Sequence, residues 1–283
     1  MNLQRHTDPA RFLEQTRPFL ERSEAANCLT IGIVNGLAAA QASSNPPFLA
    51  SLLENGEVCG TAVMTPPYHV VLSSIPESGL EVLAAHLIAS GDAVPGVYGP
   101  CDTAACFAGL WQELTGDRWT LKMRQRVHEA DHVEPVTMPS GELRQARVIP
   151  EETALLTTWA HGYIDDIPAL AQERFDAERL IVRGVEAGRY YLWCDPEPVS
   201  MAAWTGGTWN GARIYHVYTP PELRGRGYAT ACVAELTKLL LAQGRRYCFL
   251  MTDLANPTSN AIYARIGYRP VCDTDMYRQS SGE

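Results

Sequence analysis

A glycine-rich stretch in the second half of the sequence limits the chain to few folds. Gly225 and Gly227 stand between residues 212–219, which alternate like a strand, and residues 229–243, which place apolar side chains on one helical face. Glycines at a strand-to-helix junction allow successive backbone N–H groups to converge, and the helix N-terminus adds partial positive charge. The stretch therefore predicts a phosphate site, best suited to a pyrophosphate, at the start of a helix.

Two common phosphate-binding motifs do not fit this junction. No Lys-Ser/Thr pair follows the second glycine, as a P-loop requires, and the Gly-x-Gly-x-x-Gly fingerprint of dinucleotide binding is absent from it. The junction thus argues against nucleotide hydrolysis and hydride transfer. The alternative interpretation is a tight glycine turn flanked by two solvated arginines, Arg224 and Arg226.

Residues 224–229 (RGRGYA) match the Arg/Gln-x-x-Gly-x-Gly/Ala signature of the GNAT superfamily of N-acetyltransferases. A second motif at 256–268 (NPTSNAIYARIGY) looks like the element that follows the fifth strand of that family, and it stands at the expected distance behind the first. The chain therefore resembles a GNAT acetyltransferase from about residue 142 to residue 278.

The resemblance implies an acetyl-CoA site between two strands that splay apart. In the family, the pantetheine arm lies in this gap like an added strand, so residues 217–219 would follow the arm and the N–H groups of 224–230 would hold the pyrophosphate. Asn256 and Asn260 would contact the arm, although asparagine at the start of a helix is also favoured for capping. The acetyl-CoA-binding residues implied by the resemblance are Val217, Tyr218, Thr219, Arg224, Gly225, Arg226, Gly227, Tyr228, Ala229, Thr230, Asn256, Asn260 and Tyr263.

Acetyl transfer requires a neutral amine, a hydrogen-bond donor for the developing oxyanion and an acid for the departing thiolate. The backbone N–H of Val217 or Tyr218 is the candidate donor. Tyr263 occupies the position of the general acid in the family, and a tyrosine with its reference pKa of ~10 is protonated at neutral pH. A tyrosine on a helix face also fits the simpler role of a core residue.

The sequence does not select a general base, and a water relay is an alternative to all of the side chains. The candidates are Glu173, Asp165, Asp166, Glu222, Asp253 and His216. Asp165 and Asp166 lie between two predicted helices, where family members shape the acceptor pocket, so they also fit ammonium binding or a simple helix end. His216 alternates with Ile214 and Tyr218, which predicts a packed histidine on one strand face.

Segment 131–141 divides the chain, since it holds two prolines and a terminal glycine without sustained periodicity. Both flanks carry regular patterns. We therefore predict an α/β protein of two tandem GNAT-like domains, each with a mixed, mostly antiparallel sheet flanked by helices. The predicted boundaries are 1–131 for a degenerate N-terminal domain, 132–141 for a linker and 142–283 for the catalytic domain.

Hydrophobic periodicity and turn residues predict the elements of each half. In the first half we expect helices at 8–27, 29–40, 78–90 and 102–115, and strands at 48–53, 58–64, 70–72, 96–99 and 119–129. In the second half we expect strands at 142–148, 190–194, 199–205, 212–219, 247–252 and 271–278, and helices at 150–163, 168–187, 229–243 and 259–266.

The first half repeats the order of the second without its phosphate site. The predicted strand at 70–72 is followed by SSIPESG at 73–79, which has neither paired glycines nor an arginine. Converging N–H groups are therefore not predicted there. We expect this half to support the fold and to form a wall of the acceptor site.

Charge and composition narrow the classes of partner. The 23 Lys and Arg residues against 32 Asp and Glu give a net charge of -9, which disfavours nucleic acid and anionic membranes as partners. No signal-peptide pattern or apolar run of ~18 residues is found, so we expect a cytoplasmic protein. We also expect a monomer or a homodimer. The eight cysteines form no C-x-x-C pair, which predicts buried free thiols and no metal site.

Together these features predict an acetyl-CoA-dependent N-acetyltransferase, active in its C-terminal half on the primary amine of a small molecule or peptide. Two other functions are compatible with the sequence. One is an acyltransferase resembling mycothiol synthase, and the other is a CoA-responsive binding protein without catalytic activity.

Overall fold

The computed structural model describes residues 1–39, 46–167, 176–205 and 207–279. The elements of the first half are β1 (Asn2–His6), α1 (Pro9–Leu20), the 3₁₀ turn η1 (Glu21–Ser23), α2 (Cys28–Ala39), β2 (Phe48–Glu54), β3 (Glu57–Met64), β4 (Val70–Leu72), α3 (Glu77–Ser90), β5 (Gly96–Pro100), α4 (Cys101–Thr115) and β6 (Trp119–Ala130). The elements of the second half are β7 (Glu142–Gln145), α5 (Pro150–Asp165), α6 (Ala177–Glu186), β8 (Tyr190–Cys194), β9 (Pro198–Thr205), β10 (Gly211–Tyr218), the 3₁₀ turn η2 (Pro221–Leu223), α7 (Tyr228–Ala242), β11 (Tyr247–Asp253), α8 (Pro257–Ile266) and β12 (Arg269–Gln279).

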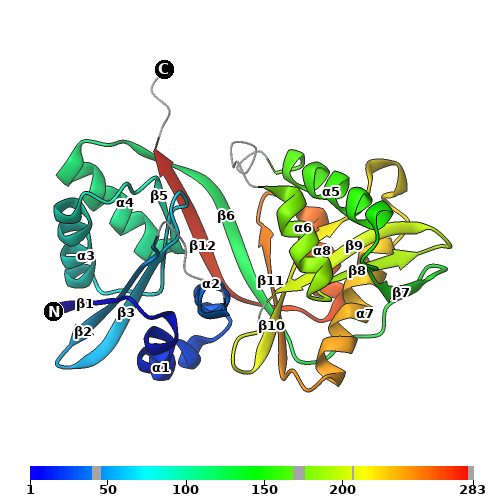
Figure 1. The fold of residues 1–283 in the computed structure, drawn as a ribbon, viewed down its shortest axis with the longest axis horizontal. Helices are drawn as coiled ribbons and strands as arrows, with labels where there is room; N and C mark the ends of the chain where they lie inside the picture. Colours follow the sequence, from blue (N-terminus) through cyan, green and yellow to red (C-terminus); the bar gives the residue numbers. More distant parts are fainter. Residues whose placement is uncertain (40–45, 168–175, 206, 280–283) are drawn as a thin grey trace.

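Within the described residues the strands form a single twelve-stranded sheet in the order β1-β2-β3-β4-β5-β12-β6-β11-β10-β9-β8-β7. Most neighbours are antiparallel, and β4–β5 and β10–β11 are parallel pairs. Figure 1 shows the two halves side by side with the sheet running through both. The predicted α/β class, with a mixed and mostly antiparallel sheet flanked by helices, is confirmed.

Most predicted elements are found within a few residues of their expected bounds, and the differences have local causes. The helix expected at 8–27 ends at Leu20, because the side chain of Asn27 donates hydrogen bonds to the carbonyls of Leu20 (3.2 Å) and Ser23 (3.1 Å) and turns the chain. The strand expected at 142–148 ends at Gln145. Residues 168–175 of the helix expected at 168–187 lie outside the described residues.

The sequence patterns missed β1, whose residues NLQRH are mostly polar. This strand lies at the edge of the sheet and is defined by antiparallel pairing with β2, where Leu3 faces Leu52 and His6 faces Leu49. Because an edge strand is defined mainly by its partner, the alternation of apolar and polar residues in its own sequence is weak. With β1 included, the two halves have the same order of strands and α-helices.

The last strand of the chain belongs to the sheet of the first half. β12 is inserted between β5 and β6, and Met276 faces Tyr98 of β5 on one side and Met123 of β6 on the other. β6 in turn pairs with β11, so that a strand of each half lies in the sheet of the other. Figure 1 shows β12 and β6 crossing the centre of the molecule together. The predicted units 1–131 and 142–283 therefore share one continuous sheet.

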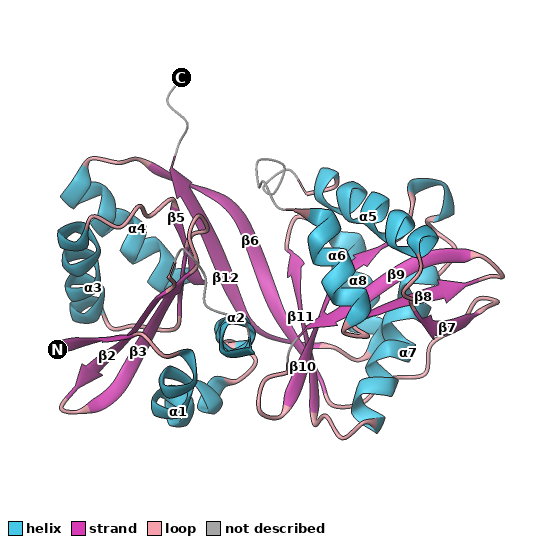
Figure 2. Ribbon diagram, viewed as in Figure 1, coloured by secondary structure: helices cyan, strands magenta, loops and turns pink. Residues whose placement is uncertain are grey.

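Helices cover both faces of this sheet (Figure 2). Leu49 and Val63 pack with α1 and α2 on one face of the first half, whereas α3 and α4 pack on the other. In the second half, α5 and α6 cover one face and α7 and α8 cover the other. Ile33 of α2 and Ile167 after α5 pack against the same buried cluster, so α2 and α5 lie on one side of the sheet, called here the α5 face. The opposite side is called the α7 face.

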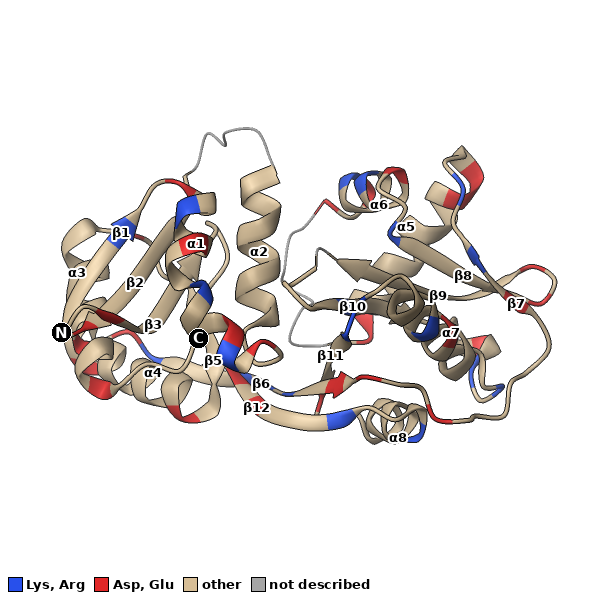
Figure 3. Cartoon of the chain, turned by 90° about the horizontal axis from the view of Figure 1, so that it is seen from below, with Lys and Arg blue, Asp and Glu red and all other residues tan. Residues whose placement is uncertain are grey.

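Helix α2 lies at the junction of the two halves and carries no charged residue, as Figure 3 shows. Its Asn35 side chain donates a hydrogen bond to the carbonyl of Gly207 (2.8 Å), in the turn between β9 and β10. In the same turn, the backbone N–H of Asn210 donates to a carboxylate oxygen of Glu24 (2.8 Å). An uncharged helix and one turn therefore connect the halves on the α5 face.

No helix in the described part of the chain is both long and apolar enough to cross a membrane. All eight cysteines are free thiols, of which Cys28, Cys194, Cys232 and Cys248 are buried. Over the same described ranges, no cluster of three or more His, Cys, Asp or Glu side chains suited to a metal ion is found.

The contact between β5 and β12 gives a direct test of the exchanged strand. A Cβ at Gly96 would overlap the carbonyl oxygen of Tyr277 in β12. We expect Gly96→Ala to lower the free energy of unfolding by about 2 to 3 kcal/mol, because the strands must separate to admit a methyl group. Urea unfolding followed by circular dichroism measures this change.

Gly109→Ala is the matched control, because Gly109 lies in the exposed part of α4 and its added Cβ would meet nothing within 4 Å apart from its chain neighbours and the nearby backbone of its own helix. Alanine is the better helix former, so this variant is expected to gain about 0.5 to 1 kcal/mol. Wild-type stability in Gly96→Ala would contradict the pairing of β12 with β5.

Candidate functional site

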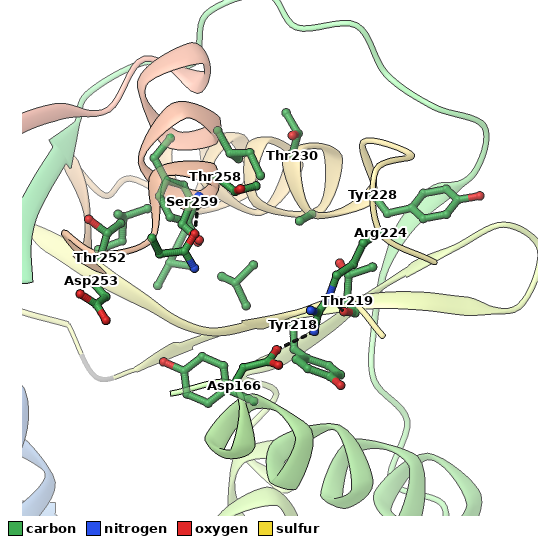
Figure 4. A pocket seen from close by; sticks show the side chains of 18 of the residues that line it. Asp166, Tyr218, Thr219, Arg224, Tyr228, Thr230, Thr252, Asp253, Thr258 and Ser259 are labelled. Carbon is green, nitrogen blue, oxygen red and sulfur yellow. Dashed lines mark hydrogen bonds and ion pairs between the residues drawn. The ribbon is translucent and has the colours of Figure 1, made fainter. Parts of the chain in front are cut away.

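Strands β10 and β11 are paired over only part of their length. The parallel ladder runs from Gly211 opposite Tyr247 to Arg213 opposite Phe249, and the strands diverge beyond it. A cleft of about 1090 Å³ opens in the gap, at the upper end of the size range of ligand pockets. Figure 4 shows Arg224 and Tyr228 on one side of this cleft and Thr252 and Asp253 on the other.

A β-bulge in β10 lies at the point where the strands diverge. Tyr215 faces Ala203 of β9 and Tyr218 faces Met201, so between these two pairs β10 has one residue more than β9. Within this bulge, His216 has a positive φ of 49°. A bulge takes backbone groups out of the ladder and re-aims them. The backbone of His216 and Val217 is therefore available to the cleft, which both residues line.

Because of the bulge, the side chains of β10 do not alternate between the two faces as the sequence pattern predicts. Ile214 and Val217 both pack on the α7 face, and Tyr215 and Tyr218 both pack on the α5 face. The sequence pattern predicted that Ile214, His216 and Tyr218 share one face of the strand. This prediction is wrong, because Ile214 and Tyr218 lie on opposite faces. The extra residue at the bulge shifts the alternation by one position.

His216 is buried at the centre of an aromatic group on the α5 face. Its Nδ1 is 2.8 Å from the hydroxyl oxygen of Tyr190, and its ring centre is 5.0 Å from that of Tyr163. Burial, with a smaller contribution from the Arg213 guanidinium, lowers the pKa of His216 to about 4. The imidazole is therefore neutral at pH 7, as expected for a packed histidine, and it also lines the cleft.

The glycine-rich stretch forms a turn at one end of the cleft. Gly225 and Gly227 have positive φ angles of 77° and 84°, and α7 begins directly afterwards at Tyr228. Gly227 is the N-cap, so no side chain covers the first N–H groups of α7. Apart from its own two chain neighbours, no described residue has an atom within 4 Å of a Cβ added at Gly225. Uncapped N–H groups beside open space at a helix N-terminus form an anion site.

Arg224 ties the glycine turn to α5. Its Nε donates to the carbonyl of Thr219 (2.9 Å), and its Nη2 forms an ion pair with Asp166 at the end of α5 (2.5 Å; Figure 4). The guanidinium lies 5.7 Å from the ring centre of Tyr218. Arg226, in contrast, is exposed, donates to the carbonyl of Glu222 (3.3 Å) and does not line the cleft. The side chain of Arg224 thus holds the turn, and that of Arg226 points elsewhere.

The two asparagines of the second motif have different positions. Asn256 caps α8 by accepting a hydrogen bond from the N–H of Ser259 (3.1 Å), and it also lines the cleft. Asn260 is not among the lining residues; its amide donates to the carbonyls of Asp253 (3.1 Å) and Asn256 (2.9 Å), and its Oδ1 accepts from Thr252 (2.6 Å). Asn260 therefore orders the turn between β11 and α8.

Tyr263 lines the cleft from α8 and is almost fully buried. Its ring packs edge-on against Tyr268, with centres 6.1 Å apart, and the hydroxyl of Tyr268 lies 2.8 Å from that of Thr237. Burial raises the pKa of Tyr263 above its ordinary value. The hydroxyl is therefore a protonated hydrogen-bond donor throughout the neutral range.

The cleft brings most of the predicted site residues together. Those that line it are Val217, Tyr218, Thr219, Arg224, Gly225, Gly227, Tyr228, Ala229, Thr230, Asn256 and Tyr263. Among the candidate bases, His216, Asp166 and Asp253 line it as well, whereas Asp165 and Glu222 are exposed outside it. Glu173 lies outside the described residues.

Residues 192–278 match the family model of FR47-like proteins, which are of the GNAT type. The whole chain is similar to a GNAT-family acetyltransferase from Colwellia psychrerythraea (TM-score 0.61, 11% identity, covering 99% of this chain and 100% of that one). It is also similar to a GCN5-related N-acetyltransferase from Sphaerobacter thermophilus (0.59, 16%, 98% and 95%). A tandem GNAT protein from the clavulanic acid biosynthesis pathway matches over the full length of both chains (0.54, 14%). The fold is that of a tandem GNAT protein.

The predicted resemblance to the GNAT superfamily and the tandem arrangement are therefore confirmed. These structural identities are low, so they establish the fold and not the reaction. The comparison with curated proteins finds no significant match.

The gap between the two parallel strands is open in one GNAT-like half and closed in the other. In the first half, a Cβ on Gly99 of β5 would lie 3.0 Å from the carbonyl oxygen of Leu72, so the ends of β4 and β5 stay in contact. Ser73 holds the chain after β4 against β3 by accepting from the N–H of Thr61 (2.8 Å). The side chain of Ile75 is buried where the other half has its glycine turn. The first half therefore lacks the features that form the cleft.

Several lining residues were missed by the sequence patterns. Met123 and Gln125 belong to β6 of the first half, and they reach the cleft because β6 pairs with β11, where Gln125 faces Asp253. Tyr163 and Arg265 line the cleft from α5 and α8. Arg265 lies within the second motif, at a position to which the motif assigns no role. Met123, Gln125 and Tyr163 stand in no motif, and only strand pairing and helix packing could reveal them.

The buried His216 predicts a dependence of stability on pH. Its pKa is lowered to about 4 in the folded state, whereas an unfolded histidine titrates near ~6.5. The unfolded chain therefore binds the proton first, and stability falls as the pH drops from ~6.5 towards 4. Between pH 7 and pH 5 this histidine should remove about 2 kcal/mol of unfolding free energy.

Urea unfolding at pH 7 and pH 5 measures this loss, and His216→Gln should reduce it by about the same amount. His161→Gln removes an exposed histidine of α5 and is the control. An undiminished loss between the two pH values in His216→Gln would contradict a buried, neutral imidazole.

Proposed function

We propose that the protein is an acetyl-CoA-dependent N-acetyltransferase that acts on the primary amine of a small molecule or peptide. The observation that carries this proposal is the continuity of one cleft, which joins the uncapped helix N-terminus at Gly227 to the gap between β10 and β11. An anion site connected to an open strand edge suits a ligand with a pyrophosphate at one end and an amide-containing arm at the other.

In this proposal the N–H groups of residues 224–230 bind the pyrophosphate of acetyl-CoA. The arm follows the free edge of β10 at Val217, Tyr218 and Thr219 and passes Asn256. The fit rests on the space at Gly225, where an added Cβ would meet no described residue other than its chain neighbours within 4 Å. Arg265, which also lines the cleft, supplies a cation for the phosphates.

The bulge and Tyr263 provide the groups that acyl transfer requires. The neutral amine attacks the acetyl carbonyl, a C–N bond forms, and the oxyanion accepts a hydrogen bond from the backbone N–H of Val217 or Tyr218. Collapse of this intermediate breaks the C–S bond, and the nitrogen loses its extra proton to water or to one of the candidate bases that line the cleft. Tyr263 then donates its proton to the departing thiolate and regains one from solvent, a role supported by its place in the lining of the cleft and by its protonated hydroxyl.

The first half acts in this scheme as a wall without a cofactor site. We propose residues 1–131 as a degenerate GNAT-like unit, 132–141 as a linker and 142–283 as the catalytic unit. Met123 and Gln125 of the first unit line the cleft, and β12 of the second unit completes the sheet of the first. The catalytic unit therefore depends on its degenerate neighbour for part of its site.

We expect one CoA to bind per chain, because only the second half joins a glycine turn to an open gap among the described residues. Isothermal titration calorimetry with CoA measures the stoichiometry. Gly227→Val should weaken binding about tenfold or more, since a β-branched residue at this positive φ strains the turn that presents the N–H groups.

Gly116→Val is the matched control, because Gly116 has a similar φ of 81° but ends α4, far along the chain from the cleft. It should be strained in the same way and bind CoA with wild-type affinity. A stoichiometry near two would contradict a single CoA site per chain. Equal affinities of the two variants would show that the glycine turn is not the CoA site.

Tyr263→Phe keeps the ring that packs against Tyr268 and removes the hydroxyl. We expect CoA affinity and melting temperature to change little, while the chemical step slows ~100-fold, which is the usual contribution of a general acid. Single-turnover acetyl transfer measures this step without interference from product release.

Tyr268→Phe is the control for loss of a buried hydroxyl nearby, because Tyr268 is bonded to Thr237 and does not line the cleft. Equal single-turnover rates in wild type and Tyr263→Phe would assign the acid role to water. Binding of CoA without turnover of acetyl-CoA over a panel of amines would favour a CoA-responsive binding protein instead.

A further inference from the structure

We propose that the acceptor amine carries an apolar group, aliphatic or aromatic, which binds against Met123, Met251 and Ile167. This inference rests on the proposed N-acetyltransferase function and specifies its substrate class. It follows from the side of the sheet on which these residues lie and from the chemistry that they share.

The cleft passes through the sheet and has a different lining on each side. The helices that begin at the glycine turn and at Asn256, α7 and α8, cover the α7 face. Met123, Met251 and Ile167 line the same cleft from the α5 face, where they pack with the buried cluster below α2. A ligand bound at the helix N-terminus therefore leaves the α5 face for the acceptor.

Three apolar side chains lie together at this end of the cleft, beside the polar groups of Tyr163 and His216. Met123 is buried, and together with Met251 and Ile167 it contacts a cluster that includes Tyr98 and Ile33. Methionine is unbranched and polarizable, so a pocket with two methionines adapts to apolar groups of different shape. A polar group placed directly against these three side chains would give up water without gaining hydrogen bonds, which is unfavourable.

The position of Met251 is fixed from the first half of the chain. The hydroxyl of Tyr98 in β5 donates to the sulfur of Met251 (3.7 Å) and lies 2.7 Å from the hydroxyl oxygen of Thr274 in β12. β5, β12, β6 and β11 are consecutive in the sheet. The exchanged strands therefore build the apolar surface, and the pocket exists only when both halves are present.

Two polar groups next to the methionines suit an amine. Gln125 of β6 and Asp253 of β11 face each other in the strand register and both line the cleft. Asp253 uses its Oδ1 to accept from the N–H of Ala255 (2.8 Å). An acceptor with one amino group and an apolar body matches this lining, with the amine towards Asp253 and the body towards the two methionines.

The test uses the wild-type protein with acetyl-CoA and the n-alkylamines from ethylamine to hexylamine, which share nearly the same ammonium pKa. Each buried methylene contributes about 0.8 kcal/mol, so kcat/KM should rise about fourfold per added carbon until the pocket is filled. Because this series needs no variant, it decides the proposal even if substitutions impair folding.

Met123→Ala and Met276→Ala then assign the effect to the pocket. Both methionines are 5% exposed and belong to the same cluster, but only Met123 lines the cleft. We expect the gain per carbon to fall below about twofold in Met123→Ala, which removes apolar contact with the acceptor, and to stay at the wild-type value in Met276→Ala. CoA affinity should be unchanged in both.

The outcomes separate this inference from the proposed function. Acetylation of the short and long amines at equal kcat/KM would overturn the apolar pocket and leave the acetyltransferase proposal intact. Equal loss of chain-length dependence in both methionine variants would also overturn it, since the effect would then come from general loosening of the core. Failure of every amine to react while CoA binds would overturn the proposed function and this inference with it.

Discussion

The site depends on the early end of the ladder between β10 and β11. Pairing stops at Arg213 and Phe249, and the bulge at His216 then carries β10 away from its neighbour. Two parallel strands that part inside a sheet leave backbone groups unpaired, which is costly unless a ligand or water satisfies them. Buried side chains pack beside the diverging strands. One of them is His216, whose Nδ1 is within hydrogen-bond distance of the Tyr190 hydroxyl. The cleft is thus a region where the sheet gives up pairing and gains a binding edge.

The same constraint explains why the two halves differ although their elements follow the same order. In the first half, Gly99 lets β5 approach Leu72 closely, and the side chain of Ile75 fills the turn that follows β4. The ends of β4 and β5 therefore contact each other directly, and no gap for a ligand opens between them. One half satisfies its parallel strands internally, and the other leaves them open.

The exchange of β6 and β12 links the two halves more tightly than a linker could. Met276 of β12 faces both Tyr98 and Met123, and Gln125 of β6 faces Asp253 at the cleft. The first half therefore contributes to the lining of the cleft through strand register. This gives a physical reason for a chain to keep a second GNAT-like unit that has no glycine turn.

The sequence by itself determined the order of the elements that follow β1 and the glycine turn. These features are local: the positive φ angles of Gly225 and Gly227 and the cap at Asn256 depend on residues close in the chain. The tertiary structure alone decided the bulge at His216, the edge strand β1 and the insertion of β12 between β5 and β6. Each of these depends on which strand lies alongside, and strand pairing between distant segments leaves little trace in either segment. For that reason the motif half of the site could be predicted from the sequence, and the wall formed by Met123 and Gln125 could not.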